Sequence, residues 1–253
     1  MTVAALILAA STDSALADVE GQPRVRRLAD IAWAGGAVPI VVGAPDPDGA
    51  VARALAGAPV TYASPAPAQS GPVGQIVNVI EAAVAEVRET DAALVWPARL
   101  VWVDPETVTS LIEAHGVHPD AVLRPTFGGE AGWPVLVPLA HLATLRGLGS
   151  GRMPEELIDD LVGAGVPEVR LDLGDPGSTY DAETARADLP PYDGPRAPVS
   201  ARTHEWGDAA ADVVDRADAD DAGDRANGGG EGPLEGPALA PFAQAEDSEA
   251  DVD

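Results

Sequence analysis

The stretch Val3–Ala9, with the sequence VAALILA, decides the fold because it is a short and continuous run of apolar residues. Such runs are typical of parallel strands that are covered by helices on both faces. The run leads into Ala15-Leu16-Ala17, which resembles a signal-peptidase site, but a secretory signal needs basic residues ahead of its apolar core. Only Met1 and Thr2 precede this core. We therefore interpret Val3–Ala9 as the first strand of a folded domain.

Apolar strand-like runs and helix-like segments alternate through the first two thirds of the chain. Strands are predicted over Val3–Ala9, Ala37–Val42, Pro59–Tyr62, Ala92–Trp96, Ala121–Arg124, Pro134–Val137 and Glu168–Leu173. Helices are predicted over Arg24–Ala34, Asp48–Ala56, Gln75–Arg88, Pro105–Ala114, Leu139–Leu145 and Pro154–Val162. Strands separated by helices of this length imply right-handed crossovers and a mainly parallel sheet. The sequence therefore predicts the α/β class.

The composition excludes several kinds of chemistry and partner. The formal net charge is -26, and all 15 basic residues are Arg, so lysine nucleophiles and Schiff bases are excluded. The absence of Cys excludes disulfides, thiolate catalysis and cysteine-ligated metals. A strongly negative field repels nucleic acid and anionic membranes, and we expect neither as a partner. With no long apolar stretch that could span a bilayer, we expect a soluble, cytoplasmic protein.

The alternating pattern stops near residue 190. The sequence predicts a domain over residues 1–189, an extended proline-rich segment over 190–206 and an acidic, disordered tail over 207–253. From Glu205 to the end, 15 acidic residues stand against 2 basic ones, and few large apolar groups are present to offset the entropy of ordering. Trp206 is unusual in such a tail: it either packs back onto the domain or anchors a partner-docking peptide.

The loops that follow the strands carry a series of short motifs: LILAA (6–10), GQP (21–23), VVG (41–43), ALVWP (93–97), VDPETV (103–108), GEAGWPVL (129–136), DPG (175–177) and YDAET (180–184). In order and content these motifs resemble the molybdenum-cofactor nucleotidyltransferases called MobA-like, and the cytidylyltransferase branch is closest. The resemblance covers roughly residues 3–188. The family implies a three-layer, Rossmann-like fold of the nucleotide-diphospho-sugar transferase (GT-A-like) kind.

The resemblance also implies a site. Family members bind a nucleoside triphosphate and Mg²⁺, and a substrate phosphate attacks the α-phosphorus, so CTP or GTP and Mg²⁺ are the expected ligands. Ala9, Ala10 and Ser11 match the nucleotide-binding loop. Arg99 stands where the family has a Mg²⁺-binding Asp, and the resemblance makes it the candidate catalytic residue. Asp181 and Glu183 match the later carboxylate pair and are the candidate metal ligands.

Three features depart from the family's motifs. The loop over residues 11–20 lacks a glycine and a cation and holds Asp13, Asp18 and Glu20, which we expect to repel a triphosphate. The guanidinium of Arg99 repels a divalent ion; this side chain either clamps a phosphate or pairs with an acidic neighbour. The Gly-His-Pro of the cytidylyltransferase branch is Gly132-Trp133-Pro134 here.

Two functions follow as hypotheses. In the first, the chain is a nucleotidyltransferase similar to CTP:molybdopterin cytidylyltransferase, with degraded motifs. In the second, it is a non-catalytic relative that uses the same crevice to bind a cofactor or a partner, such as a protein of molybdenum-cofactor or molybdoenzyme chemistry. A glycosyltransferase with a related fold is a third and more distant alternative.

Overall fold

A central parallel strand, β1 (Thr2–Leu8), organises the computed structural model, which describes residues 2–195. Residues Val3–Ile7 of β1 are all buried, as expected for a strand with neighbours on both sides and helices on both faces. The strand pairs in parallel with β4 (Ile40–Gly43) on one side and with β6 (Thr90–Pro97) on the other. The first strand predicted from the sequence is therefore confirmed as a buried strand with parallel neighbours on both sides.

The main sheet has the strand order β10-β7-β9-β6-β1-β4-β5, and β8 pairs with β7 outside this path. Its remaining strands are β5 (Thr61–Ala63), β7 (Val122–Phe127), β8 (Glu130–Ala131), β9 (Val135–Pro138) and β10 (Glu168–Asp172). Four of the strand pairs are parallel, and the antiparallel pairs of this sheet all involve β8 or β9. The sheet is thus mixed and mainly parallel, as the α/β prediction requires.

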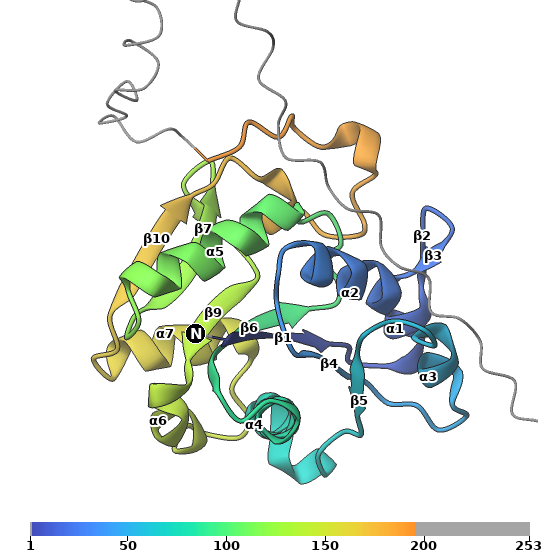
Figure 1. Cartoon of the computed structure of the whole chain (residues 1–253), viewed down its shortest axis with the longest axis horizontal. Helices are drawn as coiled ribbons and strands as arrows, with labels where there is room; N and C mark the ends of the chain where they lie inside the picture. Colours follow the sequence, from blue (N-terminus) through green and yellow to red (C-terminus); the bar gives the residue numbers. More distant parts are fainter. Residues whose placement is uncertain (1, 196–253) are drawn as a thin grey trace, which may run out of the picture. The chain divides into compact units, whose positions relative to one another are not determined.

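Helices cover both faces of this sheet and form a three-layer arrangement (Figure 1). On one face lie α2 (Arg24–Ala34) and α5 (Pro105–Val117), and on the other lies α4 (Gly71–Glu86) beside α6 (Leu142–Arg146). Helix α7 (Pro154–Gly163) packs against α4 and α6, and α3 (Ala50–Ala54) packs against α1 (Thr12–Leu16). The buried face of α4 consists of Val73, Ile76, Val79, Ile80 and Ala83, at helical spacing.

Several short elements were not predicted from the sequence. They are α1, the hairpin of β2 (Asp18–Val19) and β3 (Gln22–Pro23), and β8. Single-turn 3₁₀ helices span Ala68–Ser70, Leu139–His141, Pro176–Ser178 and Arg186–Asp188. The sequence of α1, β2, β3 and β8 shows neither a continuous apolar run nor a helical period, so the apolar pattern does not reveal them.

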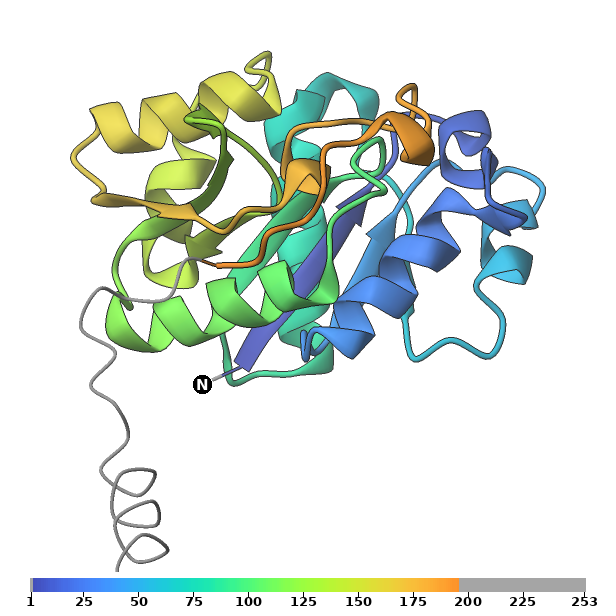
Figure 2. The same cartoon turned by 90° about the horizontal axis from the view of Figure 1, so that it is seen from above.

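The described part of the proline-rich segment, residues 190–195, contacts the domain. Tyr192 donates a hydrogen bond of 2.8 Å from its hydroxyl to Glu106 Oε2, and the Asp193 N–H donates to Gly174 O at 3.1 Å. Figure 2 shows this stretch in orange, running beside β10 and the loop after β6. The predicted acidic tail of residues 207–253, and Trp206 with it, lies outside the described residues. None of the helices within residues 2–195 is long and apolar enough to cross a membrane.

Candidate functional site

A pocket of about 570 Å³ opens at the carboxyl ends of three neighbouring strands. Residues 8–10 at the end of β1, 43–45 at the end of β4 and 97–99 at the end of β6 line one side of it. Its walls come from the loop before α4 and from the first turns of α4 and α7, with Pro65, Ala66, Ala68, Pro72, Gln75, Ile76, Val79, Met153, Pro154 and Glu155. Most of these side chains are apolar, and the pocket therefore offers a largely apolar cavity with few polar groups.

The position of the pocket follows from the topology of the sheet. From β1 the chain proceeds outward to β4 and β5, and it then returns to the other side of β1 to form β6. The loops after β1 and β6 consequently diverge toward opposite sides, which leaves a crevice at the carboxyl edge. Ala9, Ala10 and Arg99, which the sequence assigned to one site, all line this crevice.

Arg99 forms an ion pair across the pocket. Its Nη2 donates to Glu155 Oε1 at 2.7 Å, and the two side chains are 49% and 44% exposed. Burial raises the pKa of the Glu155 carboxyl, but the hydrogen bond from Arg99 and the residue's own backbone N–H lower it more, so that the pKa lies below its ordinary value. Glu155 therefore stays ionised at neutral pH. Of the two alternatives for Arg99, pairing with an acidic neighbour is the one observed.

The predicted nucleotide loop forms a short helix in place of a glycine-rich turn. Ser11 caps α1, and its Oγ accepts a hydrogen bond of 3.1 Å from the Ser14 N–H. The Ala9 N–H donates to Gly43 O at 3.0 Å and is thus committed to the backbone between β1 and β4. Ser14, rather than Ser11, lines the pocket. Residues 11–16 are therefore held by capping and helix bonds, without the freedom of a glycine loop.

The three carboxylates of this segment lie outside the pocket, contrary to the expectation that they face a triphosphate. Glu20 Oε2 accepts hydrogen bonds of 3.1 Å from Arg27 Nη1 and from Arg186 Nη1. Asp18 Oδ2 accepts one of 3.2 Å from the Gly21 N–H, and Asp13 is exposed in the first turn of α1. None of the three carboxylates lines the pocket, so their charge acts on a bound ligand only at a distance.

Asp181 and Glu183 lie on the segment that pairs with the backbone of Arg99. The Ala182 N–H donates to Arg99 O at 2.8 Å, and the Glu183 N–H donates to Asp181 Oδ1 at 2.9 Å. Neither residue lines the pocket. Within residues 2–195, no group of three or more His, Asp or Glu side chains is arranged to hold a metal ion. The charged lining is a guanidinium with its paired carboxylate, and this pair does not fit Mg²⁺.

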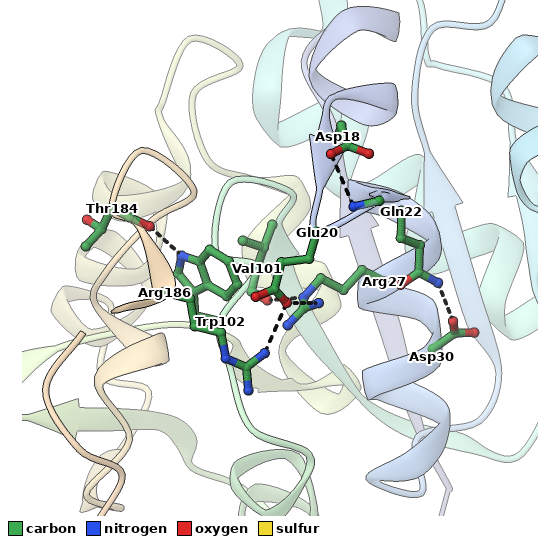
Figure 3. A network of polar contacts seen from close by, with 10 residues as sticks. Asp18, Glu20, Gln22, Arg27, Asp30, Val101, Trp102, Thr184 and Arg186 are labelled. Carbon is green, nitrogen blue, oxygen red and sulfur yellow. Dashed lines mark hydrogen bonds and ion pairs between the residues drawn. The ribbon is translucent and has the colours of Figure 1, made fainter. Parts of the chain in front are cut away.

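Trp102, in the loop after β6 that also holds Arg99, contacts the segment over residues 181–184 (Figure 3). Its indole Nε1 lies 3.0 Å from both Asp181 O and Thr184 O. The guanidinium carbons of Arg27 and Arg186 lie 5.1 and 6.0 Å from the centre of its ring, within the range of cation–π attraction. Arg27 Nε also donates to Val101 O at 3.0 Å. In this cluster Arg27 pairs with Glu20 of the preceding turn, so its charge is balanced locally.

Asp175 anchors the same region, and sequence reasoning gave it no role beyond its place in a motif. This residue is 2% exposed and accepts hydrogen bonds from the Asp104 N–H at 2.9 Å, Thr107 Oγ1 at 2.7 Å and the Gly177 N–H at 2.8 Å. Burial raises the pKa of the Asp175 carboxyl, and these hydrogen bonds only partly oppose that rise. At Gly177 a Cβ would collide with Trp102 O, so only glycine allows this close approach.

Gln75 is a second residue that sequence reasoning missed. Its Oε1 accepts from the Ala66 N–H and its Nε2 donates to Ala66 O, both at 2.8 Å. This paired contact fixes the loop over residues 65–70 against α4, where the loop forms one wall of the pocket. The sequence offers only a weak indication of this contact, because a single amide side chain early in a helix after a proline-containing loop has many possible partners.

The sequence of this domain matches a known protein family. The MobA-like NTP transferase domain family matches residues 8–164, which cover all three strand ends of the pocket. The chain belongs to this family. No curated protein matches the sequence.

Several solved structures share the fold at low identity. A nucleotidyl transferase from Methanothermobacter has a TM-score of 0.55 at 18% identity, over 67% of this chain and 87% of its own. A 2-C-methyl-D-erythritol 4-phosphate cytidylyltransferase from Thermus thermophilus has a TM-score of 0.52 at 17% identity, over 74% and 95%. A Mycobacterium tuberculosis protein in complex with manganese has a TM-score of 0.51 at 18% identity, over 68% and 89%.

Proposed function

We propose that this chain binds a cytidine or guanosine nucleotide in the pocket at β1, β4 and β6, and that its nucleotidyl transfer is weak or lost. The observation that carries the proposal is the ion pair of Arg99 with Glu155 at the position where the motifs call for a metal-binding Asp. Transfer to an α-phosphorus needs cations that offset the charge growing on the phosphoryl oxygens. A guanidinium that is already neutralised supplies little of this charge.

The nucleotide assignment rests on three supports. The chain belongs to a family of NTP transferases, a neighbour of the same fold is a cytidylyltransferase by name, and the pocket lies where α/β folds bind nucleotides. CTP and GTP are the first ligands to test, with Mg²⁺ as the family's metal. A pterin phosphate is the acceptor toward which the motifs point, and proteins of molybdenum-cofactor chemistry are the corresponding partners.

The proposal is tested by calorimetric titration with CMP, CTP, GMP and GTP, in EDTA and in excess Mg²⁺. We expect saturable binding of nucleotides of one base, with dissociation constants that differ by less than about threefold between the two conditions. Incubation with CTP or GTP and a pterin phosphate checks transfer by release of pyrophosphate. Binding that requires Mg²⁺ together with steady pyrophosphate release would restore the active-enzyme hypothesis, and an absence of any nucleotide binding would refute nucleotide recognition.

A further inference from the structure

The pocket carries no net charge on its own lining. Among the described residues that line it, Arg99 and Glu155 are the only ones with ionised side chains, and they cancel. The polar side chain of Gln75 is committed to the backbone of Ala66. A ligand with several phosphates therefore finds one guanidinium that is already paired, in a chain whose overall charge of -26 opposes it further.

Glu155 lies where an arriving phosphate would contact Arg99. It stands in the first turn of α7, directly after Pro154, and both residues line the pocket. Its hydrogen bond from Arg99 measures 2.7 Å, so a phosphate oxygen that contacts the same guanidinium must lie close to the carboxylate. Repulsion between the two anions grows with every additional charge on the ligand. A nucleoside, which has no phosphate, avoids this repulsion.

We propose that Glu155 is a specificity-determining residue that limits the negative charge of the ligand, so that the pocket selects nucleosides and nucleoside monophosphates over triphosphates. The inference rests on the proposed nucleotide binding and names its ligand class. The base and sugar occupy the apolar walls, and a single phosphate shares Arg99 with Glu155. The further phosphates of a triphosphate meet a carboxylate where a nucleotidyltransferase needs positive charge.

The experiment compares three ligands of increasing charge in EDTA: cytidine, CMP and CTP, or the guanosine series if that base binds. Calorimetric titrations are made with the full chain, with Glu155→Gln and with Glu156→Gln as the matched control. Glu156 is the next residue of α7, carries the same charge and does not line the pocket. Glutamine keeps the size and the acceptor oxygen of glutamate, and the half-exposed Glu155 contributes little to folding.

We expect the unmodified chain to bind CMP at least as tightly as CTP. Glu155→Gln should tighten CTP binding by about tenfold and change cytidine binding by less than about twofold, because only the phosphates meet the removed charge. Glu156→Gln should keep the ligand order of the unmodified chain. Tenfold tighter binding of CTP than of CMP by the unmodified chain, or a CTP-to-CMP ratio that Glu155→Gln leaves unchanged, overturns this inference while nucleotide binding stands. If neither series binds to any variant, the proposed function falls as well.

Discussion

Arg99 and Glu155 are 56 residues apart in the chain, and the pocket brings Arg99 Nη2 within 2.7 Å of Glu155 Oε1. Arg99 follows β6 and Glu155 lies in the first turn of α7, so the contact depends on how these two elements pack. Because both side chains are about half exposed, water screens their attraction. The pair is therefore a feature of the pocket's electrostatics more than a source of stability.

This screening gives the first prediction. In a double-mutant cycle of Arg99→Gln and Glu155→Gln, we expect a coupling energy below about 1 kcal/mol in the free energy of unfolding. Urea unfolding followed by circular dichroism measures the four proteins. A coupling energy of about 2 kcal/mol or more would show that the pair supports the fold, and Glu155 would then be an unsuitable site for the charge-removal experiment.

Trp102→Phe tests the cluster that holds the segment over residues 181–184. Phenylalanine keeps a ring for Arg27 and Arg186 but loses the indole N–H that reaches Asp181 O and Thr184 O. We expect a loss of about 1–2 kcal/mol in the free energy of unfolding, as is typical of a lost hydrogen-bond donor. Trp33→Phe is the control, since Trp33 is 55% exposed, and it should change stability by less than about 0.5 kcal/mol. Equal effects of the two changes would argue against the anchoring role.

Asp175→Asn tests the buried carboxylate of the same region. The amide group cannot accept from the Asp104 N–H, Thr107 Oγ1 and the Gly177 N–H together, because only one of its two heavy atoms is an acceptor. Leaving a buried donor unpaired costs about 1–3 kcal/mol, and we expect a loss of this size in chemical unfolding. Asp48→Asn, at an exposed position, should be nearly neutral. A neutral Asp175→Asn would mean that the loop adjusts without this anchor.

The buried side chain of His115 should make the stability of the fold depend on pH. The residue is 3% exposed near the end of α5, and its Nδ1 is buried without a hydrogen-bond partner. Burial lowers the pKa of the His115 imidazole, although the charges of Asp91 and Asp120 act in the opposite direction. The folded state thus disfavours the protonated form, so the stability present above the unfolded pKa of about 6.5 is lost as the pH falls below it.

The measurement compares unfolding free energies at pH 7.5 and pH 5.5. We expect His115→Gln to lose less stability between these two pH values than the unmodified chain does, because glutamine does not titrate. His118→Gln is the control at an exposed position of the same helix end, and it should behave like the unmodified chain. The same pH response in all three proteins would show that His115 can accept a proton in the folded state without penalty.

The family's fold could be predicted from local pattern. All seven strands and all six helical segments expected from the sequence overlap elements of the structure, and Arg24–Ala34 is matched at both ends. These elements can be predicted because a continuous apolar run or a 3.6-residue period depends only on residues that are close in the sequence. The short helix α1 was not predicted from local pattern. The expectation that Asp13, Asp18 and Glu20 lie at the pocket was wrong.

The sequence by itself determined the order of strands and helices, and it placed Ala9, Ala10 and Arg99 at strand ends that share one edge of the sheet. Only the tertiary structure decided the charge of the pocket. Glu155 reaches Arg99 because α7 packs beside α4, and Glu20 is bound outside the pocket by the nearby Arg27 and by Arg186, which is 166 residues away in the chain. Ion pairs between residues far apart in the chain produce no periodic pattern in the sequence, because they depend on packing and distance in the folded protein.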